Sequence, residues 1–433
     1  MLRGLAILGI FYMNIPFMGA RVIPSFGNPA ALGWTPADQA SWTAIQVLLE
    51  GTQRCLLEFL FGAGMMVLTA RAMEPDGPVA VADLYYRRNM WLLLFGLFDI
   101  FGLLWPGDIL HVYAIAALFL FPFRKLGPRA LVAIGSLCAL VTFIGGTASY
   151  VERATLVQRH RTALTHVQAG QRPTAADTKA IADWRKVEAR RAGPPELRNA
   201  AQLERRSHSG GFMTYATYYW TVWTGFFFPN LVLLTVFEAF CAMCIGIALW
   251  KWGVIQGERS TRFYVTMALI AYGVGVPLRW IGAVEISAHT LDAKTIWASE
   301  EIARLAMGLG HVALVNWAVR TRLGHAILAP FKAAGRTAFS LYFLEQIIGL
   351  WILFAPWGPG LWNRYSWAGL AAIATAVSVV NLIIANLWVR RFANGPLEWL
   401  WRSLAYVRWQ PFLKPRGGVA AAGPLQGAPL PAE

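Results

Sequence analysis

Charged residues are scarce in this 433-residue chain, where they make up 14% of the sequence. A soluble domain carries roughly 25%, and 57% of the residues here are hydrophobic. A water-soluble fold cannot bury so large an excess of apolar side chains. The apolar residues also form long runs, such as residues 130–149 and 366–389. Each run is long enough to cross about 30 Å of hydrocarbon as a helix.

Cysteine is also rare, with four residues in the chain, and so small a number excludes a disulfide framework. Cys241-x-x-Cys244 has the spacing of a redox or metal motif, but no second pair and no nearby histidine completes a tetrahedral site. The sequence also lacks a Walker loop, a dinucleotide-binding fingerprint and an H-E-x-x-H motif. We therefore expect no metal cofactor.

The apolar runs predict an all-α polytopic membrane bundle, because helices satisfy their own backbone hydrogen bonds in lipid. We expect about ten transmembrane helices in one membrane domain, residues 1–415, in the inner (cytoplasmic) membrane. The first run resembles a signal peptide in length, but Asn14 and Pro16 interrupt it, which favours a retained span. The predicted spans are residues 4–19, 42–69, 89–105, 108–122, 130–150, 228–250, 263–282, 302–319, 337–354 and 366–389.

The distribution of lysine and arginine predicts the orientation. If the N-terminus is cytoplasmic, the inside segments hold twenty of these residues and the short outside loops hold three, namely Arg21, Lys294 and Arg364. The positive-inside rule then places both termini in the cytoplasm. The net charge of +15 is explained by this topology and by anionic lipid, so we expect no nucleic-acid partner.

Two segments depart from the membrane pattern. Residues 151–211 form a polar insertion on the predicted outside, rich in helix formers and broken near Gly193. We expect one or two polar helices there, acting either as a solvated connector or as a cap over an extracytoplasmic cavity. Residues 416–433 are rich in glycine, proline and alanine, and we expect a disordered tail.

Ionisable and amide side chains inside the spans are the candidates for chemistry, because such groups are costly in lipid and usually face a bundle interior or a cavity. Thirteen polar residues of this kind occur within or at the ends of the predicted spans, too many for a passive anchor. They are Asn14, Arg54, Glu58, Asp99, Asp108, His111, Glu238, Arg279, Glu300, Glu301, Arg304, His311 and Glu345.

Helical spacing suggests pairs among these residues. Arg54 and Glu58 lie four apart, and Arg304 lies four after Glu300 and three after Glu301, which allows ion pairs within one helix. Asp108 and His111 follow the Pro106-Gly107 turn, and a carboxylate beside an imidazole is the arrangement that orients a general base. Neutralisation of buried charge explains each pair equally well.

Several segments resemble YeiB-like membrane proteins, a family defined by a domain of unknown function. The matches run along the whole chain in the expected order. They are residues 2–10 (LRGLAILGI) with Asn14, residues 59–64 (FLFGAG), Arg87-Arg88, residues 105–110 (WPGDIL) with Tyr113, Gly335-Arg336 with Ser340 and Tyr342, and residues 395–402 (GPLEWLWR).

That family is grouped with the transmembrane acyltransferases, which include the heparan-α-glucosaminide N-acetyltransferase. The resemblance implies transfer of an acyl group, and most simply an acetyl group, from a cytoplasmic acyl-CoA such as acetyl-CoA to a sugar, glycan or other small acceptor. Arg87, Arg88 and Arg336 are then the expected donor-binding residues, since arginine forms charge-assisted bonds with phosphate. Asp108 and His111 are the expected acid and base.

The sequence also departs from the family pattern. Asn14 stands where the O-acetylating branch carries a histidine, so it fits the glucosaminide branch and is expected to position a reactant. Asp99 stands where histidine is common, and Glu345 follows Ser340 and Tyr342 where other polar residues are usual. A Leu-Asp pair that usually precedes the Arg-Gly is missing, so the true start is expected upstream.

Two other functions fit the same residues. The intramembrane charges are also typical of a transporter or exporter of a small anionic or amphipathic molecule, although the sequence has no convincing internal repeat. A non-catalytic partner of other envelope proteins is the third alternative. Under each of these functions the intramembrane polar set includes Arg54, Glu58, Arg304 and His311. The sequence does not determine the oligomeric state, and a homo-oligomer is one possibility.

Overall fold

The computed structural model describes residues 1–21, 28–70, 80–192 and 195–414. The predicted tail, residues 416–433, and the expected break at Gly193 lie outside these residues. Within the described part the chain is helical and forms no β-strand, only an isolated bridge between Phe392 and Leu413. The prediction of an all-α bundle is confirmed.

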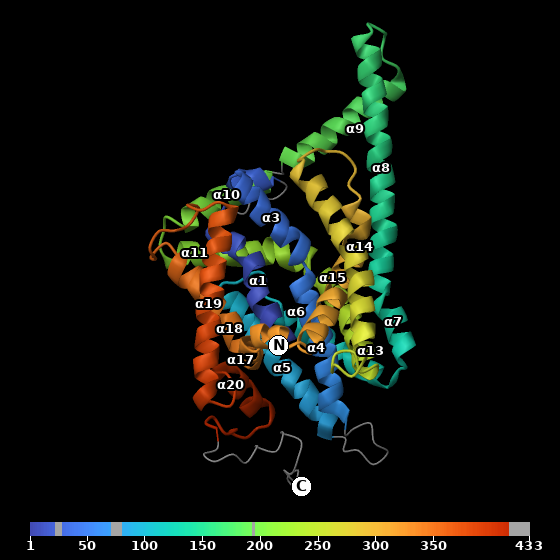
Figure 1. Cartoon of the computed structure of the whole chain (residues 1–433). Helices are drawn as coiled ribbons and strands as arrows, with labels where there is room; N and C mark the ends of the chain where they lie inside the picture. Colours follow the sequence, from blue (N-terminus) through green and yellow to red (C-terminus); the bar gives the residue numbers. More distant parts are fainter. Residues whose placement is uncertain (22–27, 71–79, 193–194, 415–433) are drawn as a thin grey trace.

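The first half of the chain builds the centre of the bundle and one edge (Figure 1). Its helices are α1 (Leu2–Gly19), η1 (Pro29–Leu32), α3 (Pro36–Leu48), α4 (Thr52–Thr69), α5 (Ala80–Phe101), α6 (Leu110–Leu120), η3 (Phe121–Lys125), α7 (Pro128–Gly135), α8 (Leu137–Gln168), α9 (Ala175–Ala192), α10 (Pro195–Ser207) and α11 (Phe212–Val222).

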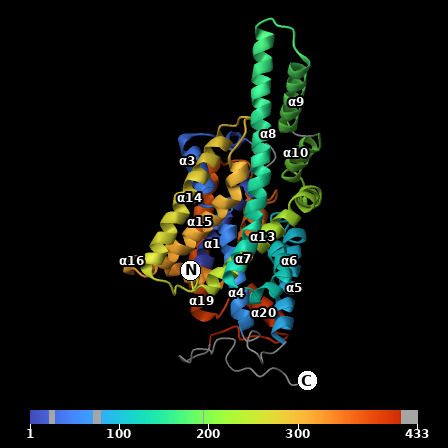
Figure 2. The same ribbon diagram turned by 90° about the vertical axis from the view of Figure 1, so that its right-hand side faces the viewer.

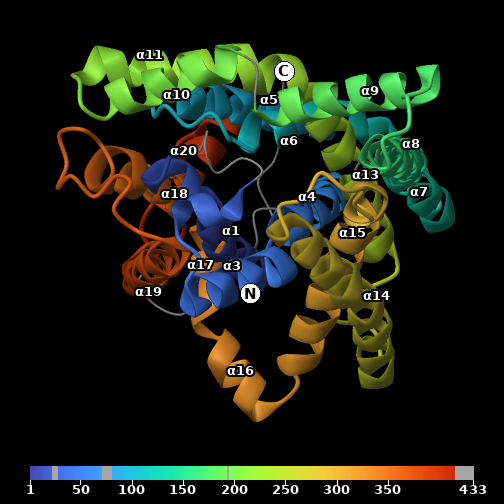
Figure 3. The same cartoon turned by 90° about the horizontal axis from the view of Figure 1, so that it is seen from above.

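The second half completes the bundle on both sides of α1 and α4 (Figure 3). Its elements are the π-helical turn η4 (Trp223–Phe227), α12 (Phe228–Asn230), α13 (Val232–Lys251), α14 (Thr261–Ser287), α15 (Ile296–Ala318), α16 (Arg322–Leu328), α17 (Pro330–Arg336), α18 (Ala338–Gln346), the π-helical turn η5 (Ile347–Leu353), α19 (Trp367–Arg391) and α20 (Pro396–Ala405).

Five described helical segments are long and apolar enough to cross a membrane, and a bent pair, Ile296–Ala318 with Arg322–Leu328, raises the number to six. The five are α1, the α7–α8 segment, α13, α14 and α19. Their outer faces carry exposed apolar side chains, for example Leu233 at 83% and Leu269 at 70% exposure. Surfaces of this kind indicate contact with lipid. The chain is a helical membrane protein, with fewer qualifying helices than the ten predicted.

Two predicted spans have different boundaries from the observed helices. Residues 42–69 form two helices, α3 and α4, because Gly51 between them adopts a left-handed conformation with φ of 64°. Residues 130–150 lie in α7 and α8, and α8 continues to Gln168 without interruption. The sequence turns polar near Tyr150, but the helix does not end there, since helix-forming residues continue the backbone hydrogen bonding.

The polar insertion is helical and extends well beyond the bundle (Figure 2). The upper part of α8 runs away from the bundle, and α9 and α10 return beside it. His208, at the end of α10, stacks on Trp362 with ring centroids 4.0 Å apart, and burial lowers the pKa of His208 to about 4. Tyr215 of α11 donates a hydrogen bond to the carbonyl of Leu350. The insertion therefore docks on the bundle through α10 and α11.

Glycines let α4 and α13 approach closely at the centre. A Cβ on Gly62 would collide with the backbone carbonyl of Met243, and a Cβ on Gly246 would collide with that of Phe59. Small residues at such contacts are typical of packed membrane helices. This contact fixes α4, which carries one wall of the cavity described next.

Candidate functional site

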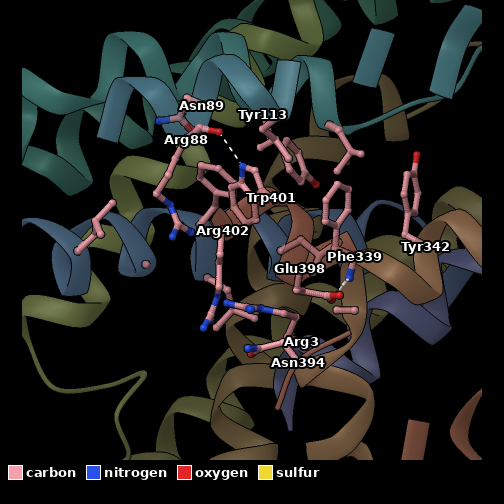
Figure 4. Close-up of a pocket in the computed structure, with 18 of the residues that line it drawn as sticks. Arg3, Arg88, Asn89, Tyr113, Phe339, Tyr342, Asn394, Glu398, Trp401 and Arg402 are labelled. Atoms are coloured by element: carbon pink, nitrogen blue, oxygen red, sulfur yellow. Dashed lines mark hydrogen bonds between the residues drawn. The ribbon is translucent and has the colours of Figure 1, made fainter. Parts of the chain in front are cut away.

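A cavity of about 560 Å³ opens at the end of the bundle where α20 lies. Its volume is in the range of small-molecule sites, about 300–1,000 Å³. Helices α1, α4, α5, α6, α18 and α20 supply most of its walls (Figure 4). The lining residues are Arg3, Ile7, Leu57, Leu60, Phe61, Gly64, Met65, Val67, Leu68, Tyr85, Arg88, Asn89, Leu92, Ile109, Leu110, Tyr113, Gly335, Arg336, Ala338, Phe339, Tyr342, Asn394, Glu398, Trp401, Arg402, Tyr406 and Gln410.

Arginine dominates the polar part of this cavity. Arg3, Arg88, Arg336 and Arg402 line it, and Glu398 is the one acidic residue among the lining residues. In Figure 4 the side chains of Arg3, Arg88 and Arg402 reach toward the same region. Guanidinium groups gathered in this way repel one another unless an anion lies between them. The cavity therefore has the charge of an anion-binding site.

Glu398 balances only part of this charge, because it is one carboxylate among four arginines and its oxygens also bond to α18. One oxygen accepts the backbone N–H of Phe339 at 2.7 Å, and the other accepts the Ser340 hydroxyl at 2.5 Å. Burial raises the pKa of the Glu398 carboxyl, and these hydrogen bonds oppose that rise. Glu398 thus caps the start of α18 and fixes α20 against it.

Trp401 fixes the position of Arg88. The indole N–H donates to the backbone carbonyl of Arg88 at 2.8 Å, and the Arg88 guanidinium lies over the indole ring, 4.4 Å from its centroid. A cation over an aromatic face is attracted by the ring quadrupole. Tyr406 also bonds to the guanidinium, and no carboxylate among the described residues forms a salt bridge with it.

Two tyrosines connect the cavity to buried polar groups. The Tyr113 hydroxyl donates to the backbone carbonyl of Arg54 at 3.1 Å. The Tyr342 hydroxyl lies 3.3 Å from Oδ1 of Asp108 and accepts the backbone N–H of Ile109 at 3.3 Å. In Figure 4 Tyr342 lies apart from the arginines. Tyr342 and the arginines therefore mark different ends of the cavity.

Asp108 and His111 form the predicted pair. Nδ1 of His111 lies 2.8 Å from Oδ2 of Asp108, which also accepts the backbone N–H of His111 at 2.8 Å. Nε2 of His111 is buried and has no hydrogen-bond partner. Gly96 of α5 makes this geometry possible, because a Cβ there would collide with Asp108 and with the His111 backbone. The carboxylate orients the imidazole and leaves one ring nitrogen free.

Asp108 and His111 do not line the cavity themselves, and Tyr342 is the lining residue that reaches them. Asp99 is fully buried beside Asp108 and Tyr342. Asn14 lies half-buried on α1, eleven residues from Arg3, which corresponds to about 16 Å along a helix. Asn14 is not a lining residue.

A separate ionic cluster joins α4, α13 and α15. The Arg304 guanidinium lies 2.7 Å from Glu58, 2.6 Å from Glu301 and 3.0 Å from Glu238. Arg54 pairs with Glu238 and lies 3.7 Å from Glu58. Three carboxylates thus surround two guanidinium groups, each with a partner. The predicted Arg54–Glu58 and Glu301–Arg304 pairs are confirmed.

The other predicted polar residues are spread through the bundle. Glu300 is exposed and is not part of the ionic cluster. Arg87 pairs with Asp83 one turn earlier on α5 and does not line the cavity, unlike Arg88 and Arg336. His311 contacts the Met307 carbonyl and the Tyr272 hydroxyl. Glu345 is buried and lies 3.5 Å from the Asn381 amide.

In the described part of the chain, no three histidine, cysteine, aspartate or glutamate side chains are arranged so that they could hold a metal ion. Cys241 and Cys244 are buried thiols, as are Cys55 and Cys138. The structure thus shows no metal centre among these residues.

The segments that carry the family resemblance all contribute to the cavity. They lie far apart in the sequence, yet each supplies lining residues. These are Arg3 and Ile7; Leu60, Phe61 and Gly64; Arg88; Ile109, Leu110 and Tyr113; Gly335, Arg336 and Tyr342; and Glu398, Trp401 and Arg402.

Comparison with known proteins finds relatives of uncharacterised function. The family profile described as "Protein of unknown function (DUF418)" matches residues 249–408. The chain is similar to the uncharacterized protein YxaH of Bacillus subtilis, with 29% identity over 95% of this chain and 94% of YxaH. It is also similar to the uncharacterized protein YeiB of Escherichia coli, with 25% identity over 93% of this chain and 94% of YeiB. The chain is therefore similar to YeiB-like proteins over nearly its whole length. No solved structure gives a significant match.

Within this YeiB-like protein, sequence reasoning missed most of the cavity residues. The motifs contain Arg3, Arg402, Glu398, Trp401, Tyr113 and Tyr342, but none of these residues is predicted from the sequence to bind a ligand. The one available signal in the sequence was that these residues occur in short motifs, several of which also contain an arginine. The convergence of the segments on one cavity comes only from the tertiary structure.

Proposed function

We propose that this protein is a ten-span acyltransferase of the inner membrane with both termini in the cytoplasm. It takes an acyl-CoA from the cytoplasmic side and passes the acyl group to a sugar or other small acceptor. The observation that supports the proposal is the cavity. Its lining contains four arginines, a single acidic residue and an apolar wall, and the segments that resemble the family supply most of these residues. Phosphates would compensate the arginines through charge-assisted bonds.

In this proposal Arg3, Arg88, Arg336 and Arg402 hold the donor phosphates, and the acyl thioester points toward Tyr342. The acceptor hydroxyl or amine attacks the thioester carbonyl, a new C–O or C–N bond forms, and the C–S bond breaks. The proton of the acceptor passes to the Asp108–His111 pair through the Tyr342 hydroxyl, and the CoA thiolate leaves. Asn14 positions the acceptor from the outer side.

Ligand-induced stabilisation tests the donor assignment. Purified protein in neutral-lipid nanodiscs is heated with and without acetyl-CoA, since a ligand that prefers the folded state raises the apparent melting temperature. We expect a rise with acetyl-CoA and with CoA, and no rise for the Arg88→Gln/Arg402→Gln double variant. Arg408→Gln is the matched control, because Arg408 is exposed on the same segment and does not line the cavity. An absent shift with the unaltered protein contradicts the proposal.

An exporter of an anionic amphiphile is the second candidate. The observation that favours it is the ionic cluster of Arg54, Glu58, Glu238, Glu301 and Arg304, which Tyr113 connects to the cavity. Buried charges of this kind are typical of transport pathways. Transfer of radiolabelled acyl from the donor to an added sugar or amine supports the enzyme, whereas movement of an unchanged amphiphile across vesicles supports the exporter.

A further inference from the structure

The part of the cavity away from the arginines is apolar. Leu57, Leu60, Phe61 and Met65 of α4 form one wall, and Leu92 of α5 and Ile7 of α1 lie on others. An acetyl group has a single methyl carbon and would leave most of this surface without a partner. Burial of each further methylene strengthens binding by about three- to fourfold. The apolar wall therefore favours a longer chain.

One side of α4 leaves space for such a chain to continue. A Cβ on Gly64 would meet no atom within 4 Å, although Gly64 lines the cavity. Val67, one turn further, also lines the cavity and is 52% exposed. Together they make an apolar path from the interior of the cavity to the surface of α4. A chain that outgrows the cavity has a route along this helix.

Charge and shape thus select one kind of ligand. The arginine end suits phosphates, and the apolar end suits an alkyl chain, so the two ends fit an amphiphile with a phosphorylated head. We propose that the donor is a medium- or long-chain acyl-CoA, of eight acyl carbons or more, and not acetyl-CoA. The inference rests on the proposed function, because it takes CoA as the phosphorylated carrier.

A chain-length series tests this inference. The affinities of CoA, acetyl-CoA, butanoyl-CoA, hexanoyl-CoA and octanoyl-CoA are measured by calorimetry in neutral-lipid nanodiscs, below the micellar concentrations and with empty nanodiscs subtracted. We expect Kd to fall at least thirtyfold from acetyl-CoA to octanoyl-CoA. Equal affinities across the series overturn the chain-length inference and leave the acyl-CoA proposal standing. No binding of any CoA compound overturns both.

Gly64→Leu locates the chain. The leucine side chain fills the open space beside α4, so we expect the ratio of the acetyl-CoA Kd to the octanoyl-CoA Kd to shrink at least tenfold. Gly145→Leu is the matched control, because Gly145 of α8 also has open space around its Cβ but does not line the cavity. If Kd depends on acyl-chain length in Gly64→Leu as it does in the unaltered protein, the proposed path along α4 is wrong.

Octyl phosphate separates an acyl carrier from a simple phosphorylated lipid. It has the alkyl chain and one phosphate but no nucleotide. We expect it to bind at least tenfold more weakly than octanoyl-CoA, because it reaches fewer arginines. Equal affinity would assign the cavity to a lipid phosphate and overturn the acyl-CoA identity of the ligand.

Discussion

The cavity and the ionic cluster contain similar residues in opposite arrangements. In the cluster, Arg304 lies within 3.0 Å of carboxylates from three helices, so buried charge is neutralised within the protein. In the cavity, four arginines share one carboxylate, and that carboxylate is bonded to α18. Charge balance, and not the number of intramembrane charges, therefore distinguishes a structural network from a binding site.

Removal of Arg304 is expected to have the largest effect. Arg304→Ala leaves Glu58 and Glu301 buried without their main partner, and loss of one member of a buried ionic network costs about 3–5 kcal/mol. We expect a large fall in the thermal stability of the purified protein. Glu300→Gln is the control, because Glu300 is exposed on the same helix. Unchanged stability of Arg304→Ala would mean that the cluster is not structural.

Removal of two cavity arginines is expected to affect binding and not stability. Charge-assisted hydrogen bonds are worth about 1.5–3 kcal/mol each. The Arg88→Gln/Arg402→Gln variant should therefore bind CoA compounds about a hundredfold more weakly, as measured by calorimetry. Its melting temperature without ligand should stay the same or rise, since the repulsion among the guanidinium groups is relieved. A stability loss as large as that of Arg304→Ala would erase the distinction between the two regions.

Tyr342 is expected to position the Asp108–His111 pair. Tyr342→Phe removes the hydroxyl that contacts Asp108, while the ring that lines the cavity remains. Loss of such a hydrogen bond is worth about 1 kcal/mol, so we expect kcat to fall by about fivefold with donor affinity unchanged. Steady-state transfer assays with separate kcat and KM values measure this effect. A change confined to KM would assign Tyr342 to donor binding alone.

The smallest effect is expected in the polar insertion, far from both regions. Hydrogen bonds from the Thr174 hydroxyl and amide, followed by His166, lower the pKa of Asp177 at the start of α9. This stabilisation is present above the ordinary carboxyl pKa and is lost as pH falls through the lowered one. Asp177→Ala should speed hydrogen exchange in the first turn of α9 at neutral pH and leave CoA binding unchanged. Altered binding would show that the insertion acts on the cavity.

Local pattern predicted the parts of the site that lie within one helix or turn. A spacing of three residues was sufficient to predict the contact between Asp108 and His111 and the contact between Glu301 and Arg304. Side chains three residues apart on a helix lie on the same face and can touch. The contacts of Arg304 with Glu58 and Glu238 were not predicted, since they join three helices whose packing depends on close approaches such as Gly62 against Met243.

The sequence by itself determined that the chain is a helical membrane protein similar to YeiB-like proteins, because apolar runs and ordered motifs are properties of the linear chain. Only the tertiary structure decided which arginines share a cavity and which are neutralised. Arg87 and Arg88 are adjacent in sequence, yet Arg87 pairs with Asp83 and Arg88 lines the cavity over Trp401. Consecutive helical residues point about 100° apart, so packing against α20 selects between them.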